Sequence, residues 1–282
     1  MFSHGFNTSY MTQNQLNRIS VLGRKVRKFP KSLFFKVWYT YVSKVDKNAE
    51  VTFMNYGYSK DHQTIELKEK DKINRYSSQL YHYVAEGIDI QGKDILEIGC
   101  GRGGGLSYIN RYMSPKSAVG LDLNKTSIEF CKKHYSDENI RFIRGNAERL
   151  HFRENTFDVV INVESSHRYL QIENFLKEAY RVLKPGGFLL FADFRPDNEL
   201  ELLDNQLKCA RFIPLKNEII TTNVLEALKL TSTERQILVR KLTPRMLHRM
   251  GDMFATTKGT PTFNKLANHQ FEYLFYMLMK SH

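Results

Sequence analysis

The chain has 282 residues, 41% of them hydrophobic and 12% aromatic, which suffices for one large folded domain and excludes a disordered chain. The formal net charge is +12, and residues 18–47 alone carry nine Lys or Arg against one Asp. Such an excess favours an anionic partner, which could be a phospholipid surface, nucleic acid or an acidic substrate. Cys100, Cys131 and Cys209 form no C-x-x-C pair, which argues against a disulfide framework or a zinc site and indicates a reducing compartment.

The N-terminal part of the chain divides into a basic arm and a helical segment. Residues 1–30 are predicted to be a flexible basic arm, and their start lacks the apolar run of a secretory signal. Residues 31–90 are predicted to be mainly helical and to cover a binding site. Within them, a basic helix with Trp38 on its apolar face either covers the core or lies in a membrane interface, and both interpretations stay open. We expect a cytoplasmic protein that contacts anionic membrane peripherally through residues 18–47.

From residue 91 onward, short apolar runs alternate with amphipathic helical patterns. The runs that indicate strands are 94–98, 117–123, 140–145, 157–163 and 188–194. Their alternation with helices predicts right-handed crossovers and a doubly wound, mostly parallel seven-stranded α/β sheet of the Rossmann-like type. We assign the cofactor-binding core to residues 91–195 and a helical substrate lid, inserted after the fifth strand, to residues 196–250. Residues 251–282 are predicted to form the C-terminal strands that complete the sheet.

A glycine-rich loop follows the first predicted strand. The sequence there is "LEIGCGRGGG", in which Gly99 and Gly101 permit a tight turn and close approach of a ligand, and the next helix offers free N–H groups. Asp122 ends the second strand about twenty residues later, where a carboxylate can accept both hydroxyls of a ribose. After the third strand, Asn146 and Ala147 are placed to meet the edge of an adenine. These residues predict a nucleotide-containing cofactor, and a dinucleotide enzyme stays open at this point.

Five motifs in order resemble those of the class I S-adenosylmethionine-dependent methyltransferases. They read "LEIGCGRG", "GLDLN", "GNAERLHF", "FDVVINVES" and "LKPGGFLLFAD". The resemblance implies the class I methyltransferase fold, S-adenosyl-L-methionine as cofactor and S-adenosyl-L-homocysteine as product, with no metal.

The resemblance also implies which residues bind the cofactor. Glu97 would orient the glycine loop behind the methionine part, and Tyr81 would close over it. Asp122 would hold the ribose, Leu123 would lie against the adenine, and Asn162 would present its carbonyl to the cofactor's amino group. The full implied set is Glu97, Gly99, Gly101, Asp122, Leu123, Asn146, Ala147, Asn162 and Tyr81.

A closer resemblance extends over about residues 31–200. Its motifs are "KVW" at 36–38, "QLYH" at 79–82, "NVESSH" at 162–167 and "ADFRPDNE" at 192–199. These are similar to the phthiotriolone-type dimycocerosate O-methyltransferases, which methylate hydroxyl groups on large lipids and polyketides. The chain departs from many relatives with Asn146 in place of Asp and His151 in place of Pro. The amide oxygen of Asn146 can still accept a hydrogen bond, so the adenine contact should survive.

The stretch "NVESSHRYL" at 162–170 contains the candidate catalytic residues. His167 follows the fourth strand, beside the expected methyl donor, and an imidazole with a pKa near 6.5 suits deprotonation of an attacking hydroxyl. Glu164 is expected to orient that imidazole or to bind substrate or cofactor. A hydrolase would use Ser165 or Ser166 as nucleophile, but the glycines of a nucleophile turn are missing. One of these serines is instead expected to cap the next helix.

The sequence therefore predicts a methyltransferase that methylates oxygen on a bulky apolar small molecule, either a lipid or a polyketide. Methylation of RNA or of an amine nitrogen, and a methyltransferase fold repurposed as a cyclase or a sensor, stay open as alternatives. Nucleic acid is the less favoured partner because no recognition module is visible. A homodimer is left open.

Overall fold

The computed structural model describes residues 38, 40–42, 44–61 and 63–282. The chain divides into two units, Met1–Tyr39 and Thr40–His282. Of the first unit only Trp38 is described, and it is helical. The predicted arm 1–30 and most of the basic segment 18–47 lie outside the described residues. Every element named below belongs to the second unit.

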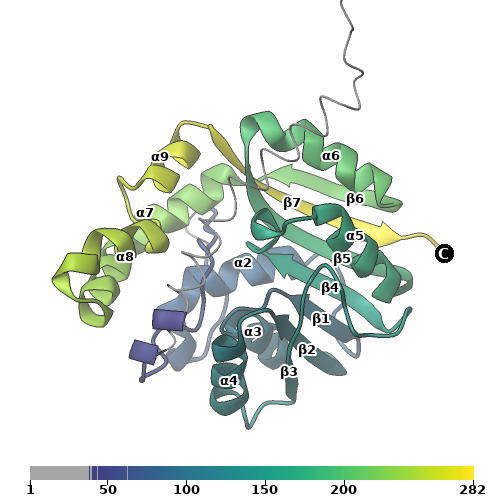
Figure 1. The fold of residues 1–282 in the computed structure, drawn as a ribbon, viewed down its shortest axis with the longest axis horizontal. Helices are drawn as coiled ribbons and strands as arrows, with labels where there is room; N and C mark the ends of the chain where they lie inside the picture. The colour runs from purple at the N-terminus through teal and green to yellow at the C-terminus, as the bar shows by residue number, and fades with distance from the viewer. Residues whose placement is uncertain (1–37, 39, 43, 62) are drawn as a thin grey trace, which may run out of the picture. The chain divides into compact units, whose positions relative to one another are not determined.

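In the described chain, the strands form one seven-stranded sheet with the order β3-β2-β1-β4-β5-β7-β6 (Figure 1). Neighbouring strands are parallel except at β7, which runs antiparallel to β5 and to β6. The strands are β1 (Asp94–Ile98), β2 (Ser117–Asp122), β3 (Ile140–Arg144), β4 (Phe157–Val163), β5 (Leu183–Pro196), β6 (Phe212–Ile219) and β7 (Phe271–Lys280). The prediction of a doubly wound, mostly parallel sheet is confirmed.

Helices cover both faces of the sheet, which explains why the central strands are apolar throughout rather than alternating. On β1, Ile95 belongs to the core cluster on one face, whereas Leu96 and Ile98 belong to the cluster on the other. The α-helices are α2 (Arg75–Ala85), α3 (Gly104–Met113), α4 (Lys125–His134), α5 (Ile172–Val182), α6 (Leu200–Cys209), α7 (Thr221–Leu242), α8 (His248–Ala255) and α9 (Pro261–Ala267). Short 3₁₀ turns are η1 (Glu69–Asn74), η2 (Ser166–Arg168), η3 (Asp197–Glu199) and η4 (Arg245–Leu247).

The two helical layers come from different parts of the chain. Apolar residues of α2, α3, α4, α7 and α9 belong to the core cluster on one face of the sheet. Those of α5 and α6 belong to the cluster on the other face, as Figure 1 shows for α5 and α6 beside β5 and β6. The parallel strands β1 to β5 therefore end at a common edge of the sheet, where a ligand of an open α/β fold binds.

Three predictions about the flanking segments need correction. The described part of the segment 31–90 is not mainly helical, because its residues 46–61 and 63–68 form neither helix nor strand. Several of their backbone groups are bound instead by side chains of distant elements, such as those of Glu164 and Arg235, which the local sequence pattern does not register. Helix resumes only at η1 and α2.

The predicted helical lid at 196–250 contains a strand. Residues Phe212–Ile219 form β6, the outer strand of the sheet, and α6 before it packs with α5 against the sheet. The helical insert therefore follows β6 and consists of α7, η4, α8 and α9. The segment 251–282 likewise contains one strand, β7, preceded by the end of α8 and by α9, rather than several strands. No helix among the described residues is both long and apolar enough to cross a membrane.

Candidate active site

The glycine loop between β1 and α3 adopts backbone angles that favour glycine. Gly99, Gly101 and Gly103 have φ angles of +81°, +54° and +79°. A Cβ atom at Gly99 would lie 2.0 Å from the hydroxyl oxygen of Ser165, so only glycine fits there. The loop is tied to β2 because the N–H groups of Gly99 and Cys100 both donate to the carbonyl of Leu121.

Asp122 stands at the end of β2, beside this loop. Its carboxylate accepts hydrogen bonds from the N–H of Gly101 at 2.9 Å and from the N–H of Asn124 at 2.7 Å. Burial raises the pKa of Asp122 above its ordinary value, and these two N–H donors oppose the rise. The side chain is thus fixed next to the turn, where sequence reasoning placed the ribose contact.

Glu97 and Tyr81 meet behind the glycine loop. The hydroxyl of Tyr81 on α2 donates to Glu97 Oε1 at 2.5 Å. The other carboxylate oxygen, Oε2, is buried and has no hydrogen-bond partner. Burial raises the pKa of Glu97 to about 7, against the lowering effect of the Tyr81 bond. The ring of Tyr81 fits only because position 105 is Gly, where a Cβ would lie 1.8 Å from the ring.

Asn162 at the end of β4 provides a second buried acceptor without a partner. Its amide nitrogen donates to the carbonyl of Ile98 at 2.7 Å and to the hydroxyl of Tyr169 at 2.9 Å. Because the nitrogen is committed to two acceptors, the oxygen is identified as the atom that is buried and unpaired. Buried polar atoms without partners are rare, and two acceptors beside one glycine loop indicate a ligand that carries donors or positive charge.

Three predicted adenine contacts follow the ends of neighbouring strands: Leu123 follows β2, and Asn146 and Ala147 follow β3. Leu123 is a large apolar side chain that is 56% exposed, directly after Asp122. Asn146 is exposed, and its amide oxygen accepts the N–H of Glu148 at 3.0 Å. Ala147 is buried. An exposed leucine next to a polar edge suits the flat apolar face and polar rim of a purine.

A strap formed by residues 46–58 crosses the glycine loop, and sequence reasoning missed it. Asp46 accepts the N–H groups of Glu50 and Val51 and pairs with the buried guanidinium of Arg102 at 2.8 Å. Arg102 Nε also donates to the carbonyl of Val51. The carbonyl of Thr52 accepts the N–H of Gly104 at 3.2 Å, at the start of α3.

The far end of the strap is held by α7 and by the end of β4. Arg235 Nη2 donates to the carbonyls of Asn55 and Tyr56 at 3.0 and 3.1 Å. The N–H of Tyr56 donates to Glu164 Oε1 at 2.7 Å. Most of these partners are backbone atoms, which any sequence presents, so the residue pattern gave no signal for the strap.

His167 lies in η2 and forms a close pair with Asp193 of β5. Its Nδ1 is 2.7 Å from Asp193 Oδ1, and its backbone N–H donates to Oδ2 at 2.8 Å. On the other side of the ring, Arg168 Nε donates to His167 Nε2 at 3.0 Å. A carboxylate on one nitrogen and a guanidinium on the other fix the neutral tautomer with the proton on Nδ1.

The electrostatics of the pair agree with this tautomer. Burial lowers the pKa of His167, and Asp193 only partly opposes this. For Asp193, burial alone would raise the pKa, but the His167 ring, the Arg195 guanidinium and the hydrogen bonds from His167 and Ser166 hold it below its ordinary value. Ser166 donates to Asp193 Oδ2 at 2.6 Å and accepts from Arg195 at 2.6 Å, which completes the support of the carboxylate.

Glu164 does not orient His167, contrary to one of the two roles expected for it. Its Oε1 accepts the N–H of Tyr56 and the hydroxyl of Tyr273, the latter at 3.0 Å. Glu164 has a φ of +47°, and this left-handed residue turns the chain so that His167 comes back over β5 beside Asp193. Burial raises the pKa of Glu164 to about 8, against the two hydrogen bonds.

The helix-cap prediction for the two serines is also wrong. Ser166 belongs to the separate turn η2, and α5 begins only at Ile172, after Gln171. Ser165 instead packs on Gly99 and exchanges a hydrogen bond with Tyr169 at 2.8 Å. Tyr169 and Asp193 are thus functional-site residues that sequence reasoning missed, although "ADFRPDNE" included Asp193 among the residues of the resemblance.

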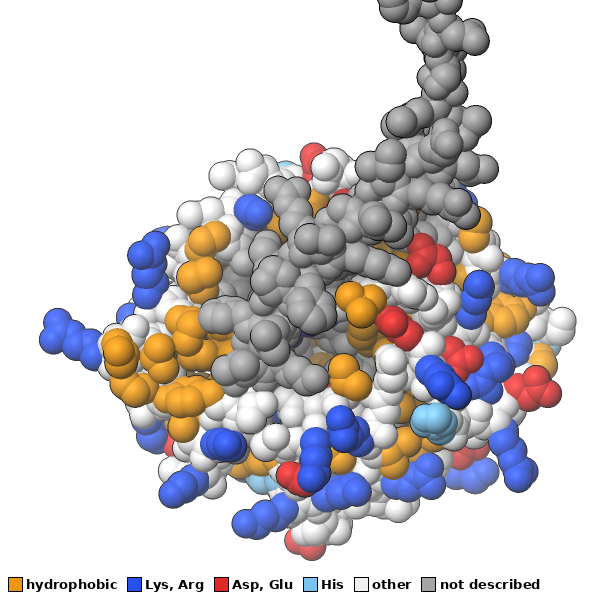
Figure 2. All heavy atoms as spheres, viewed as in Figure 1, with side chains coloured by type: hydrophobic (Ala, Val, Ile, Leu, Met, Phe, Trp, Pro, Cys, Tyr) orange, Lys and Arg blue, Asp and Glu red, His pale blue; other side chains and the backbone are white. Residues whose placement is uncertain are grey.

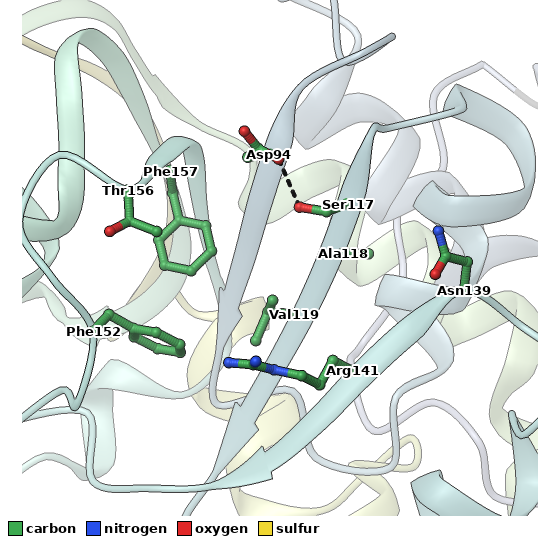
Figure 3. Close-up of a pocket in the computed structure, with 9 residues that line it drawn as sticks. All are labelled: Asp94, Ser117, Ala118, Val119, Asn139, Arg141, Phe152, Thr156 and Phe157. Carbon is green, nitrogen blue, oxygen red and sulfur yellow. Dashed lines mark hydrogen bonds between the residues drawn. The ribbon is translucent and has the colours of Figure 1, made fainter.

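A separate hollow of about 390 Å³ lies at the opposite edge of the sheet (Figure 3). Its lining residues include Asp94 and Ser117, joined by a 2.8 Å hydrogen bond, and Arg141 and Phe157. Asp94 begins β1, whereas the glycine loop follows the end of this strand, so the hollow is separate from the candidate site. Among the residues that the structure describes, no cluster of His, Cys, Asp or Glu has the arrangement of a metal site.

Comparison with known proteins identifies the family of the chain. A family profile described as "Methyltransferase domain" matches residues 96–191. The chain is 36% identical to phthiotriol/phenolphthiotriol dimycocerosates methyltransferase of Mycobacterium tuberculosis, over 87% of this chain and 92% of that one. It is also 36% identical to the fatty-acid O-methyltransferase of Mycolicibacterium smegmatis, over 87% and 89%.

A solved structure shares the fold. Geranyl diphosphate C-methyltransferase from Streptomyces coelicolor, in a complex that contains S-adenosyl-L-homocysteine, has a TM-score of 0.60 and 15% identity and covers 84% of this chain and 95% of that one. The two unpaired buried acceptors, Glu97 Oε2 and Asn162 Oδ1, fit a ligand with an ammonium group, and the glycine loop leaves room for its approach. The chain belongs to the S-adenosylmethionine-dependent methyltransferase family.

Proposed function

We propose that the enzyme methylates an oxygen atom of a bulky apolar acceptor of lipid type, with His167 as the general base. Two relatives at 36% identity bear the names of a dimycocerosate methyltransferase and a fatty-acid O-methyltransferase. The observation that carries the proposal is the His167–Asp193 pair, because it presents a basic ring nitrogen beside the cofactor loop.

The cofactor supplies an electrophilic methyl group on a sulfonium, whose departure needs no acid. Glu97 and Asn162 would hold its amino end, Asp122 its ribose, and Leu123, Asn146 and Ala147 its adenine. Tyr81 would support Glu97 through its hydroxyl, rather than close over the methionine part as the resemblance implies. These residues bind and align the cofactor. Alignment of two reactants can by itself lower the activation free energy of a transfer step by about 7 kcal/mol.

The protein itself contributes a base, His167, which removes the proton from the hydroxyl of the methyl acceptor. Because the N–H of His167 Nδ1 donates to Asp193, the lone pair of His167 is on Nε2. When the acceptor hydroxyl donates to Nε2, its oxygen becomes a better nucleophile, and Asp193 stabilises the imidazolium that results. Arg168 Nε donates to His167 Nε2 at 3.0 Å, so the Arg168 side chain must move away before the hydroxyl of the methyl acceptor can bind there.

The wall next to His167 suits an apolar acceptor. The ring of Phe194 lies 4.4 Å from His167 and 5.3 Å from Tyr56, centroid to centroid. Phe271 stacks on the same phenylalanine at 5.7 Å. Three aromatic rings in a row offer apolar area with little entropy cost on binding. Glu164 supports this wall as a positioning residue, because it holds the backbone of Tyr56.

Localisation in the cytoplasm, and peripheral contact of residues 18–47 with anionic membrane, are part of the same proposal. Nine basic residues against one acidic residue in that segment support it. At such a membrane surface the enzyme would have access to a lipid acceptor.

Incubation of the purified enzyme with methyl-labelled cofactor and a lipid extract tests the proposal, with the labelled product identified by mass spectrometry. We expect label on an ester or ether oxygen of an apolar molecule. Parallel arms contain total RNA and soluble amines. Label in either of those arms alone, or cofactor binding without turnover on any acceptor, would contradict O-methylation of an apolar lipid and favour the RNA, amine N-methyltransferase, cyclase or sensor alternatives.

A further inference from the structure

The helical insert after β6 ends in a surface that combines exposed apolar side chains with cations. Met246 in η4 is 87% exposed, Ile237 on α7 is 62% exposed, and Met253 on α8 is 46% exposed. Figure 2 shows hydrophobic side chains gathered over α8, at the left of the view, with Lys and Arg beside them. We call Ile237, Arg245, Met246, Arg249 and Met253 the insert tip.

Positive charge predominates in the part of the chain that contains the insert tip. Residues 229–258 contain seven Lys or Arg and two acidic residues. One of the acids, Asp252, is already paired with Arg240 at 2.6 and 3.0 Å. Arg245 and Arg249 are exposed, and no carboxylate among the described residues pairs with either of them. The tip therefore has cations available for an external anion.

The tip is held in shape by contacts between α7 and α8. The Arg240–Asp252 pair joins the two helices, and a Cβ at Gly251 would lie 2.4 Å from Val239, so the helices pack closely. Along the chain, Met246, Met250 and Met253 recur at intervals of four and three residues, with Arg245 and Arg249 next to them. A short helical surface of this kind, apolar residues beside cations, suits the headgroup and upper acyl region of a bilayer. Methionine also adapts easily to a fluid apolar phase.

We infer that the insert tip docks on a bilayer that contains anionic phospholipid. Its cations would meet the phosphates, and Met246, Met253 and Ile237 would enter the acyl boundary. This inference rests on the proposed function, because a lipid acceptor is dissolved in such a bilayer. The same helix, α7, carries Arg235, which holds the carbonyls of Asn55 and Tyr56 beside the aromatic wall. Docking of the tip thus brings the acceptor wall to the membrane.

Flotation of the full-length protein with vesicles tests the inference. The vesicles contain phosphatidylglycerol and phosphatidylcholine, or phosphatidylcholine alone, at low salt. We expect binding to the anionic vesicles only. Met246→Ser with Met253→Ser should weaken it about tenfold, and Arg245→Gln with Arg249→Gln should weaken it about fivefold for each cation removed.

Two matched variants serve as controls. Ile73→Ser removes an apolar side chain that is 88% exposed, on η1, and Lys132→Gln with Lys133→Gln removes two exposed cations from α4. Both should bind vesicles as the wild type does. Turnover of a short, soluble acceptor should be unchanged in the tip variants, whereas turnover of a vesicle-embedded acceptor should fall with binding.

Several results would overturn the inference. They are the absence of wild-type binding, tip variants that bind like the wild type, or loss of binding only when basic residues of segment 18–47 are replaced. A tip variant that changes the oligomeric state by light scattering but not vesicle binding would show a second copy of the chain to be the partner. Vesicle binding is read without turnover, so a failure of the methylation proposal would be seen separately, as absent methyl transfer by a protein that still floats.

Discussion

His167 is held between a hydrogen-bond acceptor and a hydrogen-bond donor, and this arrangement decides what the ring can do. Asp193 accepts a hydrogen bond from the N–H of Nδ1, and Arg168 donates an N–H to Nε2. The ring is neutral with its lone pair toward the position of an acceptor. Burial lowers the pKa of His167, which keeps the ring neutral, and therefore able to act as a base, at pH 7.

Replacement of His167 and of Asp122 should separate chemistry from cofactor binding. We expect His167→Ala to lower turnover about 100-fold or more while S-adenosyl-L-methionine affinity stays nearly unchanged. Asp122→Ala should weaken cofactor binding first, because this carboxylate also holds the N–H of Gly101. Calorimetry with the cofactor, together with initial rates, measures both. If the two variants exchanged phenotypes, the assignment of base and ribose ligand would be wrong.

We expect Glu97 to make cofactor affinity depend on pH. Its free carboxylate oxygen is suited to an ammonium group only when the side chain is ionised, and burial raises its pKa to about 7. We expect S-adenosyl-L-homocysteine to bind about tenfold more weakly at pH 6 than at pH 8. Glu97→Gln should bind more weakly overall and lose most of this dependence. A calorimetric titration in which the variant keeps the wild-type pH dependence would exclude Glu97 as the cause.

At this scale, sequence reasoning named the proposed base, His167, but not the residues that support it. His167 could be predicted because it follows a strand next to a recognisable glycine loop. Asp193 could not be assigned as the orienting acid, because it lies 26 residues further along the chain, and the pairing of β4 with β5 together with the turn at Glu164 brings the two together. Glu164 was the nearer acid in sequence, but its left-handed backbone directs its carboxylate to Tyr56 and Tyr273.

At the scale of elements, the strap 46–58 connects the glycine loop with the insert. Its first turn depends on one buried ion pair, Asp46 with Arg102, whose guanidinium is 1% exposed and lies 3.6 Å over the ring of Phe130. One nitrogen of that guanidinium, Nη1, has no partner. The strap is therefore vulnerable at this point, because any loss of Asp46 leaves a buried charge uncompensated.

Asp46→Ala should destabilise the protein by about 3 kcal/mol, measured by urea unfolding. It should also weaken cofactor binding, since the strap contacts Gly104 at the start of α3. Asp137→Ala, at an exposed position, is the control and should have little effect. Arg102→Met in the Asp46→Ala background should recover part of the loss, because it removes the unpaired charge. No recovery would mean that Asp46 acts through its backbone hydrogen bonds alone.

The strand β6 shows why one element escaped the sequence analysis. Central strands β1 and β4 are continuous apolar runs, and their assignment was straightforward. β6 is an edge strand with mostly exposed residues, and it contains Pro214 and a register shift next to it. Its sequence therefore shows no clear alternation of apolar and polar residues. Its pairing with β7 depends on the rest of the sheet rather than on its own residues.

For the molecule as a whole, two buried carboxyl groups near the cofactor site make folding stability depend on pH. Burial raises the pKa of Glu97 from 4.5 to about 7 and that of Glu164 from 4.5 to about 8. Each group holds a proton in the folded state that the unfolded chain has already released. The free energy of unfolding should therefore fall as the pH rises above about 5.

Glu164→Gln isolates the larger of these two contributions. The amide keeps an oxygen that can accept from Tyr56 and Tyr273 but cannot ionise, so the fold is retained while the titration is removed. We expect the difference in unfolding free energy, wild type minus variant, to fall between about pH 5 and pH 8, with a slope approaching about 1.4 kcal/mol per pH unit. For Glu97→Gln the same difference should level off near pH 7, one unit earlier, because the pKa of Glu97 is lower. Urea unfolding across this range measures both, with the exposed Glu66→Gln as control. A difference for Glu164→Gln that rises with pH, or that levels off near pH 5, would show that the buried carboxyl is ionised in the folded protein.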